Sequence, residues 1–274
     1  MKKNQKKSTL LAVGVLVVAV PLLFYGITLK NNTSSIKETK VEIKNKDLPQ
    51  SDKTLTEMVE DASLEINKGP SEKSEKIAYI TIDDGPSKYT NQILDIFKKN
   101  NVKATFFMID GNMKNNPEAI KRMDKEGHSM GFHSVSHDVE KLYKTPQDTL
   151  NEFETCNSTL YNITGKTSKL IRLPYGSKPY MPEESYKKLL DNKYLIWDWN
   201  LDTLDWKSTT DQIVSNVLYY GREKEEIVLL IHEKEQSVEA LESTIKVLRE
   251  RGYEILPITE KSETKNFWKQ NLNK

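Results

Sequence analysis

Short apolar runs alternate with amphipathic helical patterns along residues 76–260, and this alternation limits the fold more than any other feature. The runs are rich in β-branched and aromatic residues and lie at 77–82, 104–109, 128–133, 170–173, 194–199, 227–231 and 253–258. Apolar residues at helical spacing lie between them, at 91–101, 117–127 and 236–252. Strand and helix in repeated alternation predict an α/β fold, a mainly parallel sheet wrapped by helices. About seven strands in one domain favour a distorted (β/α) barrel over an open sheet, although periodicity alone does not separate the two.

Charge balance and cysteine count exclude several classes of protein. The 41 Lys and Arg residues face 40 Asp and Glu residues, which gives a net charge of +1. No nucleic-acid partner is therefore expected, because bulk electrostatic binding needs a basic surplus. Cys156 is the only cysteine, so an internal disulfide and a Cys-rich zinc fold are both excluded.

Residues 10–29 form an uncharged apolar run, LLAVGVLVVAVPLLFYGITL, that follows four lysines in residues 1–9. At a rise of about 1.5 Å per residue, the run is about 30 Å long, the thickness of the hydrocarbon core of a bilayer. The lysines predict a cytoplasmic N-terminus at 1–9, a transmembrane signal-anchor at 10–29 and an extracellular remainder. A cleaved signal peptide and a buried core helix stay open as alternatives. Cleavage is disfavoured because the run is long for a signal peptide and FYGITLKNN lacks an A-x-A site.

The segment that follows the apolar run, residues 30–75, is polar, mixed in charge and poor in aromatic residues. Such a segment buries too little apolar area to offset the entropy lost on ordering, so we expect a flexible stalk. Residues 261–274 are also polar and are predicted to form a frayed C-terminal tail. The expected organisation is thus an anchor, a stalk, one globular domain over 76–260 and a short tail.

Five predicted strands end in side chains that could take part in chemistry. They lie in the motifs TIDDGP (81–86), HSVSH (133–137), RLPYG (172–176), DTLDW (202–206) and LLIH (229–232). Taken singly, each motif has an ordinary explanation, since Asp, Gly and Pro form turns and many histidines have no chemical role. Because the carboxyl ends of parallel strands lie together, one shared site is the simpler explanation. His128 lies outside these motifs and is expected to be structural.

His133 and His137 are two of the four histidines and stand four residues apart. On a helical turn, this spacing puts both imidazoles on one face, close enough to share a metal ion. Together with an aspartate, they form a set of three ligands that leaves coordination positions open. Such a set suits zinc, or another first-row divalent ion, holding a water. The sequence therefore predicts metal-assisted hydrolysis of a carbonyl compound.

The order and spacing of the five motifs resemble those of the NodB-type polysaccharide deacetylases, carbohydrate esterase family 4. The resemblance covers the whole predicted domain at 76–260, and no motif is missing. It implies the NodB-homology fold, a distorted (β/α) barrel with fewer than eight strands. It also implies one divalent metal ion, with Zn²⁺ as the first candidate and Co²⁺ or Ni²⁺ as alternatives.

The resemblance further implies a role for each matching residue on the metal side of the site. Asp83 matches the general base, and Arg172 matches the arginine that orients it. Asp84, His133 and His137 match the metal ligands.

On the substrate side, the backbone N–H of Tyr175 matches an oxyanion donor. His232 matches the general acid, and Asp205 matches the carboxylate that tunes it. Trp206 and Leu229 match an apolar wall around the acetyl methyl group. The sequence departs from the family pattern at Leu173, where proline is common, and at Glu233, where aspartate is frequent. Asp202 also fits its motif and is expected to make a supporting contact.

An anchored domain on a stalk reaches polymers at the outer face of the membrane. The expected substrate is therefore an N-acetylated glycan, most directly peptidoglycan, whose N-acetylglucosamine residues would lose their acetyl groups as acetate. Alternative substrates are chitooligosaccharides, poly-N-acetylglucosamine, N-acetylmuramic residues and O-acetylated xylan. A non-catalytic glycan-binding module and an anchored assembly protein are alternatives of other classes. A binding module should have lost a ligand or the base, and the sequence retains all of them.

Overall fold

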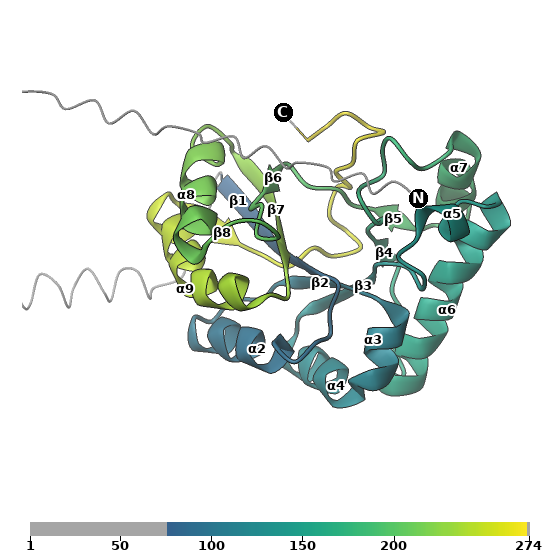
Figure 1. Cartoon of the computed structure of the whole chain (residues 1–274), viewed down its shortest axis with the longest axis horizontal. Coiled ribbons are helices and arrows are strands. Elements are labelled where there is room, and N and C mark those ends of the chain that lie inside the picture. Colours follow the sequence, from purple (N-terminus) through teal and green to yellow (C-terminus); the bar gives the residue numbers. More distant parts are fainter. Residues whose placement is uncertain (1–75, 273–274) are drawn as a thin grey trace, which may run out of the picture. The chain divides into compact units, whose positions relative to one another are not determined.

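The computed structural model describes residues 76–272, in which a parallel sheet is covered by helices (Figure 1). The strands are β1 (Lys76–Asp83), β2 (Thr105–Met108), β3 (Ser129–Phe132), β4 (Leu170–Ile171), β5 (Leu195–Ile196), β6 (Leu201–Asp202), β7 (Glu226–His232) and β8 (Tyr253–Ile255). Each of the seven predicted strand regions overlaps one of them. The additional strand is β6, which is only two residues long.

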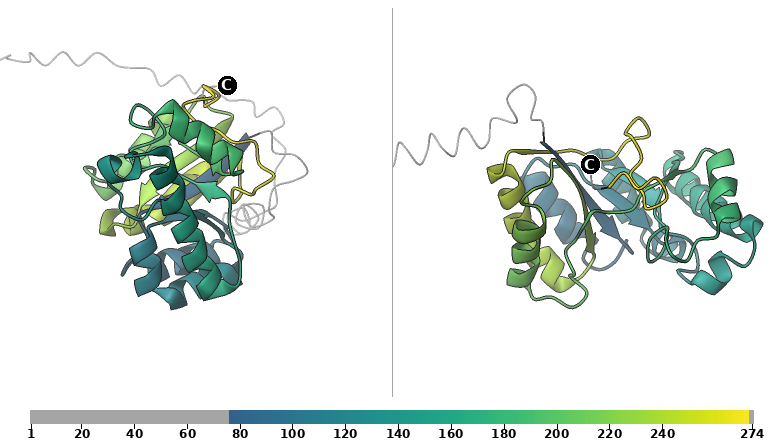
Figure 2. Two further views of the ribbon diagram at one scale, coloured as in Figure 1. Left: turned by 90° about the vertical axis from the view of Figure 1, so that its right-hand side faces the viewer. Right: turned by 90° about the horizontal axis from the view of Figure 1, so that it is seen from above.

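The helices connect successive strands and lie outside the sheet (Figures 1 and 2). They are α2 (Thr90–Lys99), α3 (Asp110–Asn115), α4 (Pro117–Glu126), α5 (Val139–Leu142), α6 (Pro146–Thr164), α7 (Glu183–Asp191), α8 (Thr210–Tyr220) and α9 (Glu235–Glu250). The helices predicted at 91–101, 117–127 and 236–252 correspond to α2, α4 and α9. Helix α4 follows its sequence signals: it has Pro117 in its first turn and ends at Gly127, whose φ is 78°.

The sheet is a curled half-barrel and not a closed barrel. Its strand order is β5-β4-β3-β2-β1-β7-β6, and within residues 76–272 no pairing joins the two end strands, β5 and β6. One edge of β1 pairs with β7 along residues 77–83. The other edge is shared, because β2 pairs with residues 81–83 and β8 with residues 76–78. The α/β architecture is therefore confirmed, with an open side where a complete barrel would close.

Within residues 76–272, none of the helices combines the length and the apolar character needed to cross a membrane. The transmembrane segment predicted at 10–29 and the stalk predicted at 30–75 lie outside the described residues.

The two faces of the sheet carry different side chains, because successive residues of a strand point to opposite faces. On β1, Ala78, Ile80 and Ile82 belong to the large apolar core under the helices. Tyr79 faces the other way and joins a smaller inner cluster. The same alternation places Asp83 on the inner face, at the end of the strand.

The segment after β8 packs against the inner face of the half-barrel, so the frayed tail predicted at 261–274 is corrected for the described part of it. Asn266 is 1% exposed, its side chain donates to the carbonyl of Ile196 over 3.1 Å, and the carbonyl of Leu272 accepts from Asn200. In Figures 1 and 2 this segment, drawn in yellow, runs from β8 toward β5. Asn266 is buried because its side chain satisfies a backbone carbonyl of the sheet, whereas Lys261, Glu263 and Lys269 of the same segment are exposed.

Candidate active site

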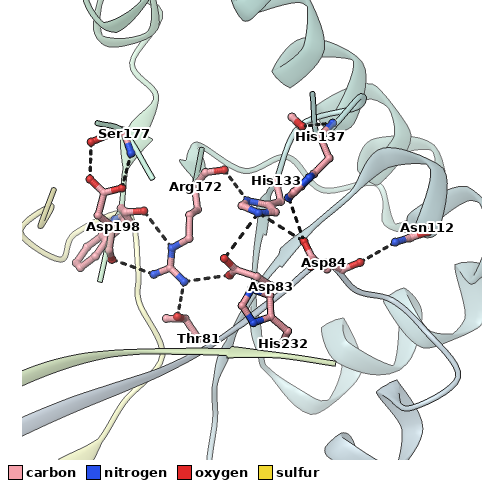
Figure 3. A network of polar contacts seen from close by, with 12 residues as sticks. Thr81, Asp83, Asp84, Asn112, His133, His137, Arg172, Ser177, Asp198 and His232 are labelled. Atoms are coloured by element: carbon pink, nitrogen blue, oxygen red, sulfur yellow. Dashed lines mark hydrogen bonds and ion pairs between the residues drawn. The ribbon is translucent and has the colours of Figure 1, made fainter. Parts of the chain in front are cut away.

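The carboxyl ends of β1, β3, β4 and β7 bring the predicted residues into one cluster (Figure 3). Asp83 ends β1, His232 ends β7, and the two are paired in the register of these neighbouring strands. Asp84 follows at a φ of 70°, so the backbone leaves the extended conformation of the strand at this residue. The backbone carbonyl of Asp84 accepts a hydrogen bond of 2.6 Å from the side chain of Asn112.

Asp84, His133 and His137 form a group that can hold a metal ion. Each residue offers one ligand atom, and the three atoms lie within 4.8 Å of one another. Asp84 Oδ1 is 3.6 Å from His133 Nε2 and 3.5 Å from His137 Nε2. It is also buried without a hydrogen-bond partner. An orphaned carboxylate oxygen facing two imidazole nitrogens fits a bound divalent cation, because a buried polar atom needs a partner.

His133 has a defined tautomer. Its Nδ1 lies 2.8 Å from the backbone carbonyl of Arg172, and a carbonyl can only accept, so Nδ1 carries the proton. The lone pair therefore sits on Nε2, which faces Asp84. Burial lowers the pKa of His133 to about 3, and the charge of Asp84 only partly opposes this change. The imidazole is thus neutral, as a metal ligand requires.

The loop that carries the two histidines is not the helical turn expected from their spacing. Ser134 and His137 have positive φ values, 72° and 49°, and the Ser134 hydroxyl accepts from the backbone N–H of His137. Glu152 of α6 holds the loop from outside, since its carboxylate accepts from the backbone N–H groups of Val135 and Ser136. The imidazole rings still meet, with centroids 5.0 Å apart, but a loop and not a helix brings them together. Nothing in the local sequence pattern indicates Glu152.

Asp83 lies between Arg172 and His133 (Figure 3). Its Oδ1 accepts from Arg172 Nη1 over 3.0 Å, and its Oδ2 is 3.8 Å from His133 Nε2. The side chain of Arg172 is fully buried and also donates to Thr81 Oγ1 and to the backbone carbonyls of Trp197 and Asp198. Burial raises the pKa of Asp83, and the charge of Arg172 opposes this rise without cancelling it. Asp83 is therefore a fixed carboxylate with an increased affinity for a proton.

His232 differs from His133 because its Nδ1 contacts a carboxylate, that of Asp205. Asp205 Oδ1 accepts from His232 Nδ1 over 2.8 Å, and its Oδ2 accepts from the His232 backbone N–H and from Ser237 Oγ. Burial alone would lower the pKa of His232, but the hydrogen bond and the charge of Asp205 outweigh burial and raise the pKa to about 9. His232 is thus protonated at neutral pH and holds a proton on Nε2.

The three residues predicted to contact substrate have different positions. Tyr175 and Trp206 are each 58% exposed, and the ring of Tyr175 lies 5.1 Å from that of His137. Leu229, however, belongs to the apolar core under the helices. Its predicted place in the wall of the site is corrected, because alternation along β7 puts Leu230, and not Leu229, on the face of His232.

Glu233, a departure from the family pattern, supports the turn after Asp84. Its Oε2 accepts from the backbone N–H and the hydroxyl of Ser87 and from the hydroxyl of Thr90. A Cβ on Gly85 would lie 2.1 Å from Glu233 Oε1, so only glycine allows this approach. The end of β7 is thereby tied to the turn that carries Asp84. His128, in contrast, is buried against Phe97 and Phe106, away from the cluster, as expected for a structural residue.

Comparisons with known proteins identify the family. A family model described as polysaccharide deacetylase matches residues 71–190. A peptidoglycan-N-acetylglucosamine deacetylase of Bacillus cereus is 35% identical over 99% of this chain and 99% of its own. The chain belongs to the polysaccharide deacetylase family. The predicted resemblance to carbohydrate esterase family 4 is confirmed, and with it the assignment to enzymes that act on amide bonds.

Solved structures of this deacetylase family agree with the fold. The polysaccharide deacetylase Bc1974 from Bacillus cereus has a TM-score of 0.68 and 40% identity, over 72% of this chain and 99% of its own. A carbohydrate esterase family 4 pseudoenzyme from Bacillus anthracis has a TM-score of 0.61 and 27% identity, over 68% of this chain and 64% of its own. The fold therefore occurs without activity, so the chemistry of a polysaccharide deacetylase must be argued from its site residues.

Proposed function

We propose that this protein is a metal-dependent deacetylase that removes the acetyl group from N-acetylglucosamine residues of peptidoglycan. The observation that carries the proposal is the pairing of Asp83 with His232 beside the Asp–His–His group. Asp83 is a carboxylate held by Arg172, and His232 is an imidazolium held by Asp205. Amide hydrolysis needs one group that accepts a proton and one that donates a proton, and these two residues are prepared for opposite roles.

One divalent ion fits the ligand atoms of Asp84, His133 and His137. We propose Zn²⁺, with Co²⁺ or Ni²⁺ as alternatives, because one carboxylate and two imidazoles suit each of these ions. When bound, such an ion supplies Lewis acidity, which acidifies water and polarises an amide oxygen.

Asp83 accepts the proton of the attacking water, and Arg172 keeps its carboxylate in place while it does so. The resulting oxyanion is met by the backbone N–H of Tyr175, a contribution worth about 3–4 kcal/mol per donor. His232 donates its Nε2 proton to the leaving nitrogen as the carbon–nitrogen bond breaks. The products are acetate and a free amine on the sugar.

The choice of substrate is supported by the site and by the relatives. Exposed Tyr175 and Trp206 offer aromatic surface for a sugar ring, and Leu230 on the face of His232 suits an acetyl methyl group. The relative that matches along its whole length is named for peptidoglycan N-acetylglucosamine. Chitooligosaccharides, poly-N-acetylglucosamine and N-acetylmuramic residues are the alternative substrates.

We further propose that the domain acts outside the cell, held at the cell membrane by the apolar segment at 10–29 and the polar segment at 30–75. Cleavage after the apolar segment would instead release the domain. A glycan-binding module without turnover is the alternative function, and the retention of all three ligands together with Asp83 argues against it.

Acetate release by the full chain, loaded with zinc, tests the proposal. Purified peptidoglycan and N-acetylglucosamine oligomers serve as parallel substrates. We expect release from peptidoglycan, its loss with a chelator, and its restoration by added zinc. Release from the oligomers alone would move the substrate to a chitin-like glycan, and release from neither would refute the proposed function.

Asp83→Asn tests the base directly. Turnover should fall about 10³-fold, within the range for removal of a general base, while the metal content stays at one ion per chain. Asp110→Asn is the matched control, because that buried carboxylate contacts Thr159 and Lys114 outside the site. Substantial activity of Asp83→Asn would remove Asp83 as the base.

A further inference from the structure

Asp198 is a buried carboxylate that joins two distant parts of the chain near the site (Figure 3). Its Oδ1 accepts from the backbone N–H of Ser177 over 2.8 Å, and its Oδ2 accepts from the Ser177 hydroxyl over 2.5 Å. The same Oδ2 accepts from the backbone N–H of Phe267 over 2.7 Å. These partners lie 21 and 69 residues away in the sequence, so Asp198 fastens the end of the chain to the loop after β4.

The fastened loop carries Tyr175, two residues before Ser177. Tyr175 and Gly176 both have positive φ values, 63° and 87°, a conformation that needs support from its surroundings. That support comes from the C-terminal segment. A Cβ on Gly176 would lie 2.8 Å from the ring of Phe267, so the loop and the ring are in close contact. Trp268 also donates from Nε1 to the carbonyl of Ser177 over 2.9 Å.

The same segment reaches the backbone that holds Arg172. Arg172 donates to the carbonyls of Trp197 and Asp198 over 3.1 and 3.0 Å. On the other side of that strand end, the N–H of Asp198 donates to the carbonyl of Lys265 over 2.9 Å. The backbone at 197–198 thus lies between the guanidinium that contacts Asp83 and the segment that follows β8.

We propose that residues 264–272 are a positioning strap for the active site, with Asp198 as its fastening residue. The strap fixes the loop that presents the Tyr175 N–H and the carbonyls that orient Arg172. Asp198 touches no reacting atom and acts through Ser177 and the backbone at 197–198. This inference rests on the proposed function, because the roles of Tyr175 and Arg172 do.

Asp198→Asn is the first test, since it keeps the shape of the side chain but replaces one acceptor oxygen with an N–H group. The kcat for acetate release by the full zinc-loaded chain should fall about 10- to 100-fold, because a misplacement of about 1 Å can cost that much rate. KM should change by a smaller factor than kcat, because Tyr175 lies on the loosened loop but Trp206, the other exposed aromatic residue, does not. Hydrogen exchange of the backbone at 173–181 should become faster.

Two further variants separate positioning from stability. Trp268→Phe removes the N–H that reaches Ser177 and reduces the size of the ring, but it keeps an aromatic ring to stack on Tyr186, so it should fold and lower kcat by a smaller factor. Tyr253→Phe is the control, because its hydroxyl donates to the carbonyl of Gly221 at the opposite ends of the strands. Tyr253→Phe should lower the melting temperature and leave kcat unchanged.

The results distinguish this inference from the proposed function. If the wild type releases acetate and Asp198→Asn keeps both its kcat and the slow exchange of 173–181, the strap is refuted. A loss of melting temperature in Asp198→Asn with unchanged kcat refutes it too, because the contact is then merely structural. If the wild type releases no acetate, the proposed function fails, whereas faster exchange of 173–181 in Asp198→Asn still supports the fastening of the loop.

Discussion

His133 and His232 occupy the two sides of one site and make the same kind of hydrogen bond, yet they differ in charge. Each uses Nδ1 over 2.8 Å, His133 toward the backbone carbonyl of Arg172 and His232 toward the carboxylate of Asp205. The pKa of His133 is lowered to about 3, and that of His232 is raised to about 9. Burial lowers both pKa values. At His232 the carboxylate on Nδ1, together with the charges of Asp83 and Asp84, outweighs burial, whereas at His133 the neutral carbonyl on Nδ1 does not.

The contrast shows how one residue type serves two purposes in a small volume. A neutral acceptor orients His133 and leaves a lone pair on Nε2 toward Asp84. A carboxylate orients His232 and keeps a proton on Nε2. The protein thus selects a ligand or an acid through the partner at the far nitrogen of each ring.

The largest expected effect comes from His133→Ala. Metal affinity should fall more than about 100-fold, because even the loss of an outer partner of a ligand costs 10- to 100-fold. Turnover should disappear with the metal. Metal content by elemental analysis and acetate release measure the two quantities. His128→Asn is the control, since it removes a buried histidine outside the site and should keep the metal. A His133→Ala protein that still holds one ion per chain would contradict the ligand role.

His232→Asn should show that the role of His232 differs from that of His133. Turnover is expected to fall about 10²- to 10⁴-fold, as for other general acids, while the metal stays bound. Loss of the metal ion in His232→Asn would instead indicate that His232 is a metal ligand, and the proposed difference between the two histidines would then be wrong.

Asp205→Asn should change the pH above which kcat/KM falls, the alkaline limb of the pH profile. His232 must be protonated to act, so kcat/KM of the wild type should fall as the pH rises through about 9. The charged groups that act on His232 are Asp205, Asp202, and the pair Asp83 and Asp84 at the end of β1. Without the Asp205 charge, burial of His232 dominates, and the limb should move down by about 1–3 pH units. An unmoved limb would show that another group titrates there.

The same pair makes a stability prediction with a defined sign. The pKa of His232 is raised in the folded state, from 6.5 to about 9. Its contribution to the free energy of unfolding is therefore complete below pH 6.5 and is lost as the pH rises through 9. Melting temperatures of the wild type should decline over this range, and those of Asp205→Asn should decline less.

The sequence predicted the side chains that could do chemistry, together with Arg172 and Asp205 beside two of them, but not the residues that hold the loops of the site. The motifs ending β1, β4 and β7 lie together because parallel strands end at one edge, which follows from topology. Asp198 and Glu152 could not be predicted, since each acts through contacts that are remote in the sequence. The buried C-terminal segment was missed because composition does not distinguish a solvated Asn from one bonded to backbone. Leu229 was misplaced because a shift of one residue along a strand reverses the face.

Ser237→Ala should have the smallest effect and sharpens the comparison most. Ser237 Oγ donates to Asp205 Oδ2 over 2.6 Å, while Oδ1 remains bonded to the His232 ring. Removing this donor should reduce stability by about 1–3 kcal/mol, as for a hydrogen bond to a charged group. The alkaline limb should stay within about 0.5 pH unit of the wild type, because the carboxylate keeps its charge. If the limb moved as far as in Asp205→Asn, the orientation of the carboxylate and not its charge would set the proton on His232. The two histidines would then differ in geometry, although their hydrogen bonds have the same length.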